Sequence, residues 1–134
     1  MLRPKHIVST KLALYSHDLE SVLAMHYPVR GHYGLPGGHV EPKENPNETI
    51  KRELLEELTL TVDNIKRTDF FMRGGNKNSI ILAFSAVAPA DVEIVPTDPE
   101  FEYGVWLTKA EIADVDMSQE YKRFVLENWP NQQA

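Results

Sequence analysis

The segment from Asn45 to Leu58 constrains the fold most, because it combines a helix start with a helical pattern. Asn45 suits an N-cap, Pro46 suits the first helical position, and Glu48 stands three residues after Asn45 as in a capping box. We therefore predict a helix over residues 46–58. Its apolar residues recur at helical spacing, and we expect the side that they form to face a core. They are Ile50, Leu54, Leu55 and Leu58.

The second half of this helix places three acids where helix electrostatics disfavours them. Glu53, Glu56 and Glu57 approach the negative end of the macrodipole, and Glu53 repels Glu57 four residues away. All three fall within an arc of roughly 100°, which we expect to point away from the leucines. A solvated charged face is one interpretation. A functional site is the other, because breaks of local rules tend to mark such sites.

A divalent cation would remove the repulsion between these acids. Clusters of carboxylate and carbonyl oxygens suit Mg²⁺ or Mn²⁺. The glycine-rich loop before the helix, which holds Gly37 and Gly38, can bring carbonyls beside the acids, and Glu44 enters from the same side. Arg52 flanks the acidic arc and reaches Glu56 at i+4.

The rest of the chain alternates between strand patterns and helix patterns. We predict strands over residues 5–16, 20–27, 58–73, 78–88 and 101–107, loops over 28–38 and 91–100, and helices over 108–115 and 118–129. The first two strands form a hairpin, and Thr108 with Glu111 forms a second capping box. This order indicates an α/β fold, with a mixed β-sheet covered by helices on its faces.

Composition narrows the classes of protein. The 134 residues, 42% of them hydrophobic, suit one domain over 1–134. The net charge of −6 argues against a nucleic acid polymer as partner but allows a small anion that a metal neutralises. The absence of cysteine excludes disulfides and thiolate metal sites. Without a long apolar run or a signal peptide, we expect a cytoplasmic protein with no membrane partner, either a monomer or a homodimer.

The spacing from Gly38 to Leu60 resembles the box of the Nudix hydrolases. Five residues separate Gly38 from Glu44, seven separate Glu44 from Arg52, and Glu53 follows directly. An aliphatic residue, any residue and the pair Glu56–Glu57 complete the match up to position 59, where Thr replaces the usual Gly. The stretches LPGG and EYGVWLTKAEI also look like the family. The resemblance implies a Nudix-type α/β/α sandwich and a hydrolase acting on phosphoanhydrides.

The resemblance also implies roles for the residues of the box. Glu53, Glu56 and Glu57 would ligate Mg²⁺ or Mn²⁺, helped by the carbonyl of Gly37 or Gly38. Glu53 is a candidate general base, and Arg52 would orient it. Glu44 would act through a water or brace the loop. The reaction would be attack of water on a phosphoanhydride of a nucleoside diphosphate linked to another group.

Outside the box, the candidates for substrate binding are Arg30, Tyr33 and one acid of a downstream loop. That acid is Asp98, Glu100 or Glu102, and we assign Glu102 to the substrate site. A solvated acidic loop is the alternative interpretation of all three. Sub-family signals are mostly absent, which favours a nucleoside triphosphate, including an oxidised one, or a small nucleotide conjugate.

Two positions depart from the family. Because Thr is β-branched and disfavours left-handed angles, we expect the helix to end at Thr59 in a different conformation from the usual glycine cap. Lys43 also stands where many members have Gly. Two other functions remain in competition with a hydrolase: a Nudix-like domain that senses a nucleotide without turnover, and an α/β domain whose acidic helix has no catalytic meaning.

Overall fold

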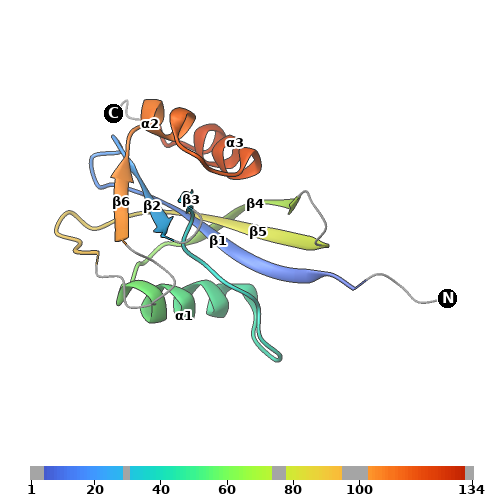
Figure 1. The fold of residues 1–134 in the computed structure, drawn as a ribbon. Coiled ribbons are helices and arrows are strands. Elements are labelled where there is room, and N and C mark those ends of the chain that lie inside the picture. The colour runs from blue at the N-terminus through green and yellow to red at the C-terminus, as the bar shows by residue number, and fades with distance from the viewer. Residues whose placement is uncertain (1–4, 29–30, 74–77, 95–102, 132–134) are drawn as a thin grey trace.

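The computed structural model describes residues 5–28, 31–73, 78–94 and 103–131. Within these ranges the chain forms a six-stranded sheet and three helices (Figure 1). The strands are β1 (Ile7–Tyr15), β2 (Val22–Tyr27), β3 (His32–Gly34), β4 (Lys66–Arg73), β5 (Ser79–Val87) and β6 (Tyr103–Leu107). The helices are α1 (Pro46–Leu58), α2 (Lys109–Asp114) and α3 (Gln119–Glu127).

The sheet is mixed, as the sequence predicted. Its order is β3-β2-β1-β5-β4, with β6 also paired to β2. Strands β1 and β5 are parallel, and the other pairs are antiparallel. Strands β1 and β2 form the predicted antiparallel pair, with Tyr15 opposite Val22.

The helices cover the two faces of the sheet (Figure 1). Helix α1 lies on one face, and α2 and α3 lie on the other. Under α1, Ile50, Leu54 and Leu58 pack against β-strand residues such as Leu12 and Phe84. On the opposite face the core contains Ile112, Tyr121, Phe124 and Val125 from the two C-terminal helices. This arrangement confirms the predicted α/β/α sandwich.

The segment that leads from β3 to α1 bridges two strands. β3 pairs with β2, and the chain then runs antiparallel along β1. The amide of Leu12 donates to the Pro36 carbonyl (2.9 Å), and that of Thr10 to the Gly38 carbonyl (2.8 Å). Residues 28–38 were predicted as a loop throughout. The three-residue β3 escaped that prediction because its stability comes from pairing with β2.

Helix α1 begins and ends at the predicted residues, and its capping box is present. One of its predicted core residues is wrong, because Leu55 is 57% exposed. The predicted direction of Glu57 is wrong as well, because Glu57 is only 3% exposed. Glu57 stands seven residues after Ile50, nearly two full turns, so it shares the core-facing side.

The strand predicted over 58–73 starts later than expected. Strand β4 begins at Lys66, and the stretch before it is irregular. Leu60 and Val62 are nevertheless buried against α1, which explains why their alternation resembles a strand. The capping box at Thr108 and Glu111 is confirmed. No helix within the described ranges is long and apolar enough to cross a membrane.

Candidate active site

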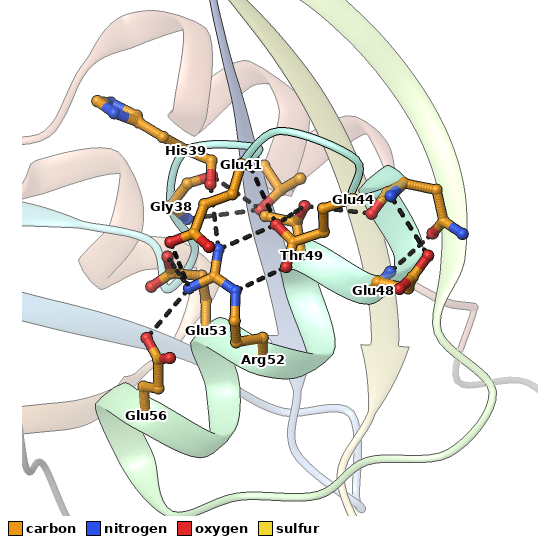
Figure 2. A network of polar contacts seen from close by, with 11 residues as sticks. Gly38, His39, Glu41, Glu44, Glu48, Thr49, Arg52, Glu53 and Glu56 are labelled. Carbon is orange, nitrogen blue, oxygen red and sulfur yellow. Dashed lines mark hydrogen bonds and ion pairs between the residues drawn. The ribbon is translucent and has the colours of Figure 1, made fainter.

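Arg52 is the centre of a carboxylate cluster on α1 and the loop before it (Figure 2). Its Nε and Nη2 donate to the two oxygens of Glu44 at 2.7 and 3.0 Å. Its Nη1 donates to Glu53 and to Glu56, both at 3.1 Å. Nη2 also reaches the carbonyl of His39 at 3.2 Å. The predicted i+4 contact with Glu56 is confirmed, and one guanidinium joins three acids of the box.

Glu44 fixes the loop to the helix. Its Oε1 accepts from the hydroxyl of Thr49 at 2.6 Å and from the amide of Glu41 at 3.1 Å. The bidentate pair with Arg52, followed by the bond from Thr49, lowers the Glu44 pKa from 4.5 to about 2. Glu44 therefore stays ionised and holds Arg52 in place near neutral pH.

Glu53 lies against the backbone of Gly38. A Cβ at Gly38 would collide with the Glu53 carboxylate, so this position has to be glycine for the contact to exist. The Glu53 side chain is 17% exposed. Burial raises its pKa, and the charge of Arg52 opposes that rise.

Glu57 is buried and bonds to the same glycine loop from the core-facing side of α1. Its Oε1 accepts a hydrogen bond from the amide of Gly37 at 3.0 Å. Gly37 has φ +145°, and a Cβ there would collide with the backbone of Thr10. Glu57 and Glu53 therefore contact adjacent glycines, which ties two acids of the box to the glycine loop.

Strand β1 holds the other side of this loop. The amide and hydroxyl of Thr10 donate to the Gly38 carbonyl at 2.8 and 3.1 Å. The ammonium of Lys11 donates to the Leu35 carbonyl at 3.2 Å. Sequence reasoning missed Thr10, Lys11 and Thr49. Their positions follow from tertiary contacts, and no spacing in the sequence signals them.

The donor set suits a hard cation. Carboxylate oxygens from α1 lie beside a glycine loop, and the Glu53 carboxylate fills the space that a Cβ of Gly38 would take. Among the described residues, no three Asp, Glu or His side chains converge as a ligand group would. The acids are instead turned towards Arg52, which supplies the positive charge at the cluster.

The helix ends in a left-handed cap in spite of its threonine. Thr59 has φ 52° and ψ 43°, and its amide donates to the carbonyls of Leu54 and Leu55. The expectation of a different helix end is therefore wrong, because Thr59 adopts the left-handed cap in spite of its β-branched side chain. Lys43 also has a positive φ, 66°. Both positions keep a backbone conformation that glycine adopts freely.

The remaining candidates lie away from this cluster or outside the described residues. Arg30, Asp98, Glu100 and Glu102 fall in the segments that the structure does not describe. Tyr33 lies in β3, where its amide donates to the Asp116 carbonyl (2.8 Å) and its ring lies 4.9 Å from that of His26. It packs against the core under α2 and α3.

A model of the NUDIX domain matches residues 5–127 of the sequence. The chain belongs to the Nudix family. This match and the fold confirm the family resemblance and make the protein a Nudix hydrolase.

Solved structures agree with this assignment. The MutT protein from Bacillus halodurans is 26% identical, with a TM-score of 0.76 over 95% of this chain and 84% of that one. The E. coli dihydroneopterin triphosphate pyrophosphohydrolase is 21% identical, with a TM-score of 0.77 over 91% and 94%. The NUDIX domain of Shewanella oneidensis NrtR, complexed with ADP ribose, is 16% identical, with a TM-score of 0.80 over 93% and 87%. No curated protein matches the sequence.

Proposed function

We propose that this Nudix hydrolase is a metal-dependent pyrophosphohydrolase that acts on nucleoside diphosphates linked to a further group. A nucleoside triphosphate or an oxidised nucleotide is the preferred class of substrate. The observation that supports this most is the contact of Glu53 and Glu57 with adjacent glycines of the loop, while Arg52 joins Glu53 to Glu44 and Glu56. The full acidic set of the family is thus present at one place.

The proposed cation is Mg²⁺, which Mn²⁺ can replace. Glu53, Glu56 and Glu57 would hold it through carboxylate oxygens, together with the carbonyl of Gly37. Gly37 is a better candidate than Gly38, because the Gly38 carbonyl already accepts two hydrogen bonds from Thr10. When bound, such a metal polarises a phosphoryl oxygen and lowers the pKa of bound water.

Glu53 is the proposed general base. Burial raises its pKa, which makes it a better proton acceptor than an ordinary surface glutamate. Arg52 is a positioning residue, because its guanidinium fixes the Glu53 carboxylate at 3.1 Å. Glu44 acts through Arg52, because its carboxylate holds the guanidinium and fixes the loop to the helix. A water that loses its proton to Glu53 would attack one phosphorus of the anhydride, and the bond from that phosphorus to the bridging oxygen would break, so that the other phosphate leaves with this oxygen.

The residues that we propose for substrate binding are inferred from the sequence. Arg30 would contact phosphate, Tyr33 would stack on the base, and Glu102 or its neighbours Asp98 and Glu100 would add a carboxylate. We further propose that the reaction is carried out by a single domain over 1–134, in the cytoplasm, on small nucleotides rather than on nucleic acid polymers.

The test is turnover of a panel of compounds with Mg²⁺. The panel contains nucleoside triphosphates, oxidised nucleotides, sugar nucleotides, dinucleotides and ADP-ribose, and release of phosphate and pyrophosphate is measured. A Glu56→Gln, Glu57→Gln double variant should lose the activity. Glu48→Gln is the matched control, because it removes an acid from the same helix while glutamine still completes the capping box.

The alternative is a domain that binds a nucleotide without turnover. The fold is shared with a NUDIX domain whose structure contains ADP ribose, and this favours the alternative as the second candidate. Calorimetry on the same panel distinguishes the two. Tight binding of one compound without turnover in Mg²⁺ or Mn²⁺ would replace the hydrolase by the sensor.

A further inference from the structure

Strand β4 forms one end of the sheet and carries an unusual surface for an edge. Within the described residues it pairs with β5 alone. Phe70 is 73% exposed and Met72 is 54% exposed on this eight-residue strand, and the strand contains no proline. Long edge strands with exposed apolar residues are templates for pairing with another chain.

The two faces of β4 differ in what covers them. Phe71 points to the α3 side, where its ring lies 6.2 Å from that of Tyr121 and 6.1 Å from that of Phe124. Arg73 shares that side, and its guanidinium lies 5.6 Å from the Tyr121 ring centre. Phe70 and Met72 alternate with these residues, so they lie on the α1 side, where α1 does not cover them.

The backbone of β4 indicates which groups face outward. The amide of Phe70 donates to the carboxylate of its neighbour Asp69 at 2.8 Å. In an antiparallel pair, alternate residues direct both backbone groups to the same neighbouring strand. Phe70 and Met72 therefore present their N–H and C=O groups to the free edge, while Phe71 bonds to β5.

We propose that this edge pairs with β4 of a second copy of the chain, antiparallel about a two-fold axis at Phe71. The Phe70 amide would then donate to the carbonyl of the partner's Met72 in place of the Asp69 carboxylate, and the Phe70 carbonyl would accept from the amide of the partner's Met72. The two exposed apolar side chains would cover each other on the α1 side of a continuous sheet. On the α3 side, Asp69 would lie directly opposite the partner's Arg73, and this pair occurs twice.

Charge selects this register over the two whose axes lie closer to the start of the strand. The bulge between Arg67 and Asp69 shifts the pairing by one residue, so a two-fold axis at Phe70 would place Lys66 opposite the partner's Arg73. An axis at Asp69 would place two aspartates opposite each other. Like charges directly opposite destabilise strand pairs and unlike charges stabilise them. The register at Phe71 is the one of the three that pairs opposite charges.

The first test is a charge exchange measured by sedimentation velocity. The wild-type chain should be a dimer, and Asp69→Arg or Arg73→Asp alone should weaken dimerisation roughly tenfold or more, because two attractive pairs become repulsive. The double variant, whose net charge equals that of the wild type, should restore the dimer. A wild-type monomer at the highest soluble concentration, or a double variant as weak as the single ones, would overturn the proposal.

The second test fixes the register by cross-linking. The chain has no cysteine, so introduced thiols report on their own positions alone. Hydrogen-bonded antiparallel residues have Cα atoms about 5.5 Å apart, which a disulfide spans. A mixture of the Phe70→Cys and Met72→Cys chains should therefore oxidise to a covalent dimer, and each chain alone should not. Efficient cross-linking of Phe70→Cys alone would place the axis at Phe70 and contradict the proposed register.

Discussion

The two ends of α1 follow local helix rules to very different degrees. At the N-terminal end, Asn45 and Glu48 form a reciprocal capping box, and Pro46 occupies the first turn. At the C-terminal end no basic residue faces the dipole, and Thr59 adopts a left-handed angle. The first end is stabilised by its own sequence. The second is held by the hydrogen bond from the Gly37 amide to Glu57 and by the bond from Arg52 to Glu56.

This difference indicates where the chain gives up local stability for chemistry. The rules broken at the C-terminal end concern Glu53, Glu56 and Glu57, the residues that we propose as ligands. The N-terminal end, which has no proposed catalytic acid beyond its flanking Glu44, breaks none. Conflicts between local preference and observed structure tend to coincide with functional sites.

The largest effect is expected at Glu57. Glu57→Gln keeps an acceptor for the Gly37 amide, so the free energy of unfolding should change by less than about 1 kcal/mol. The value of kcat should nevertheless fall roughly 10²-fold or more, because a charged ligand is lost. Glu57→Ala removes the acceptor and should also cost about 1–3 kcal/mol of stability. Steady-state kinetics and urea unfolding separate the two, and a fully active Glu57→Gln chain would contradict the role of the carboxylate.

The N-terminal end should respond in stability alone. Asn45→Ala removes the acceptor of the Glu48 amide (2.9 Å) and should cost about 1 kcal/mol. Urea unfolding gives the free energy, and kcat should stay near the wild-type value. Asn45→Asp serves as the control, because aspartate caps equally well. A large loss of kcat with intact stability would mean that this end belongs to the site as well.

Replacing the threonine of the C-terminal cap by the more usual glycine should stabilise the chain. Thr59→Gly relieves a left-handed angle that costs a non-glycine residue about 1–2 kcal/mol, less the extra entropy of glycine in the unfolded chain. The net expectation is a gain of about 0.5–1 kcal/mol in thermal or urea unfolding. Thr59→Ala is the comparison, since it removes the β-branch but keeps the Cβ. If Thr59→Gly destabilised the chain, the threonine side chain would be contributing contacts of its own.

The smallest effect is a pH dependence confined to acid solution. The pKa of Glu44 is lowered from 4.5 to about 2 in the folded chain, so its contribution to stability is complete above pH 4.5. It should be lost progressively as the pH falls towards 2. Glu44→Gln should flatten that part of the stability curve, measured by urea unfolding with a chelator present. Equal slopes for the two chains would show that Glu44 does not interact with Arg52 more strongly in the folded state.

For Glu53, the change in folding stability with pH should have the opposite sign. Burial raises its pKa in the folded chain, so its ionisation costs stability as the pH rises through that value. Glu53→Gln should remove this cost. Two acids that share one arginine therefore respond to pH in opposite directions, because the bidentate pair with the guanidinium outweighs burial at Glu44, whereas the single bond to Nη1 does not outweigh it at Glu53.

Local rules predicted what depends on neighbours in the chain. The bounds of α1, its capping box and the spacing of Glu53, Glu56 and Glu57 needed only the sequence between Asn45 and Leu60, and the second capping box needed only that between Thr108 and Glu111. The exposed Leu55 and the buried Glu57 were misassigned, because hydrophobicity was given more weight than angular position. The seven-residue interval from Ile50 to Glu57 is nearly two helical turns and therefore places Glu57 on the core-facing side.

Long-range contacts account for what sequence reasoning missed. Strand β3 has three residues and depends on β2, so no periodicity marks it. Thr10 contacts Gly38 across 28 positions, and Glu57 contacts Gly37 across 20. The acids of the site were predicted from their spacing in the sequence. Their attachment to the glycine loop required the fold.

The way in which residues 36–40 run along β1 has a consequence for length variation. Backbone bonds join this segment to Val8, Thr10 and Leu12, two residues apart each time. One added residue between Pro36 and Val40 would shift that ladder and carry Gly37 and Gly38 away from Glu57 and Glu53. Residues 41–43 are exposed and lie beyond the last of these bonds. Length changes there should leave this ladder intact but disturb Glu44, because the amide and the carbonyl of Glu41 both bond to Glu44 at 3.1 Å.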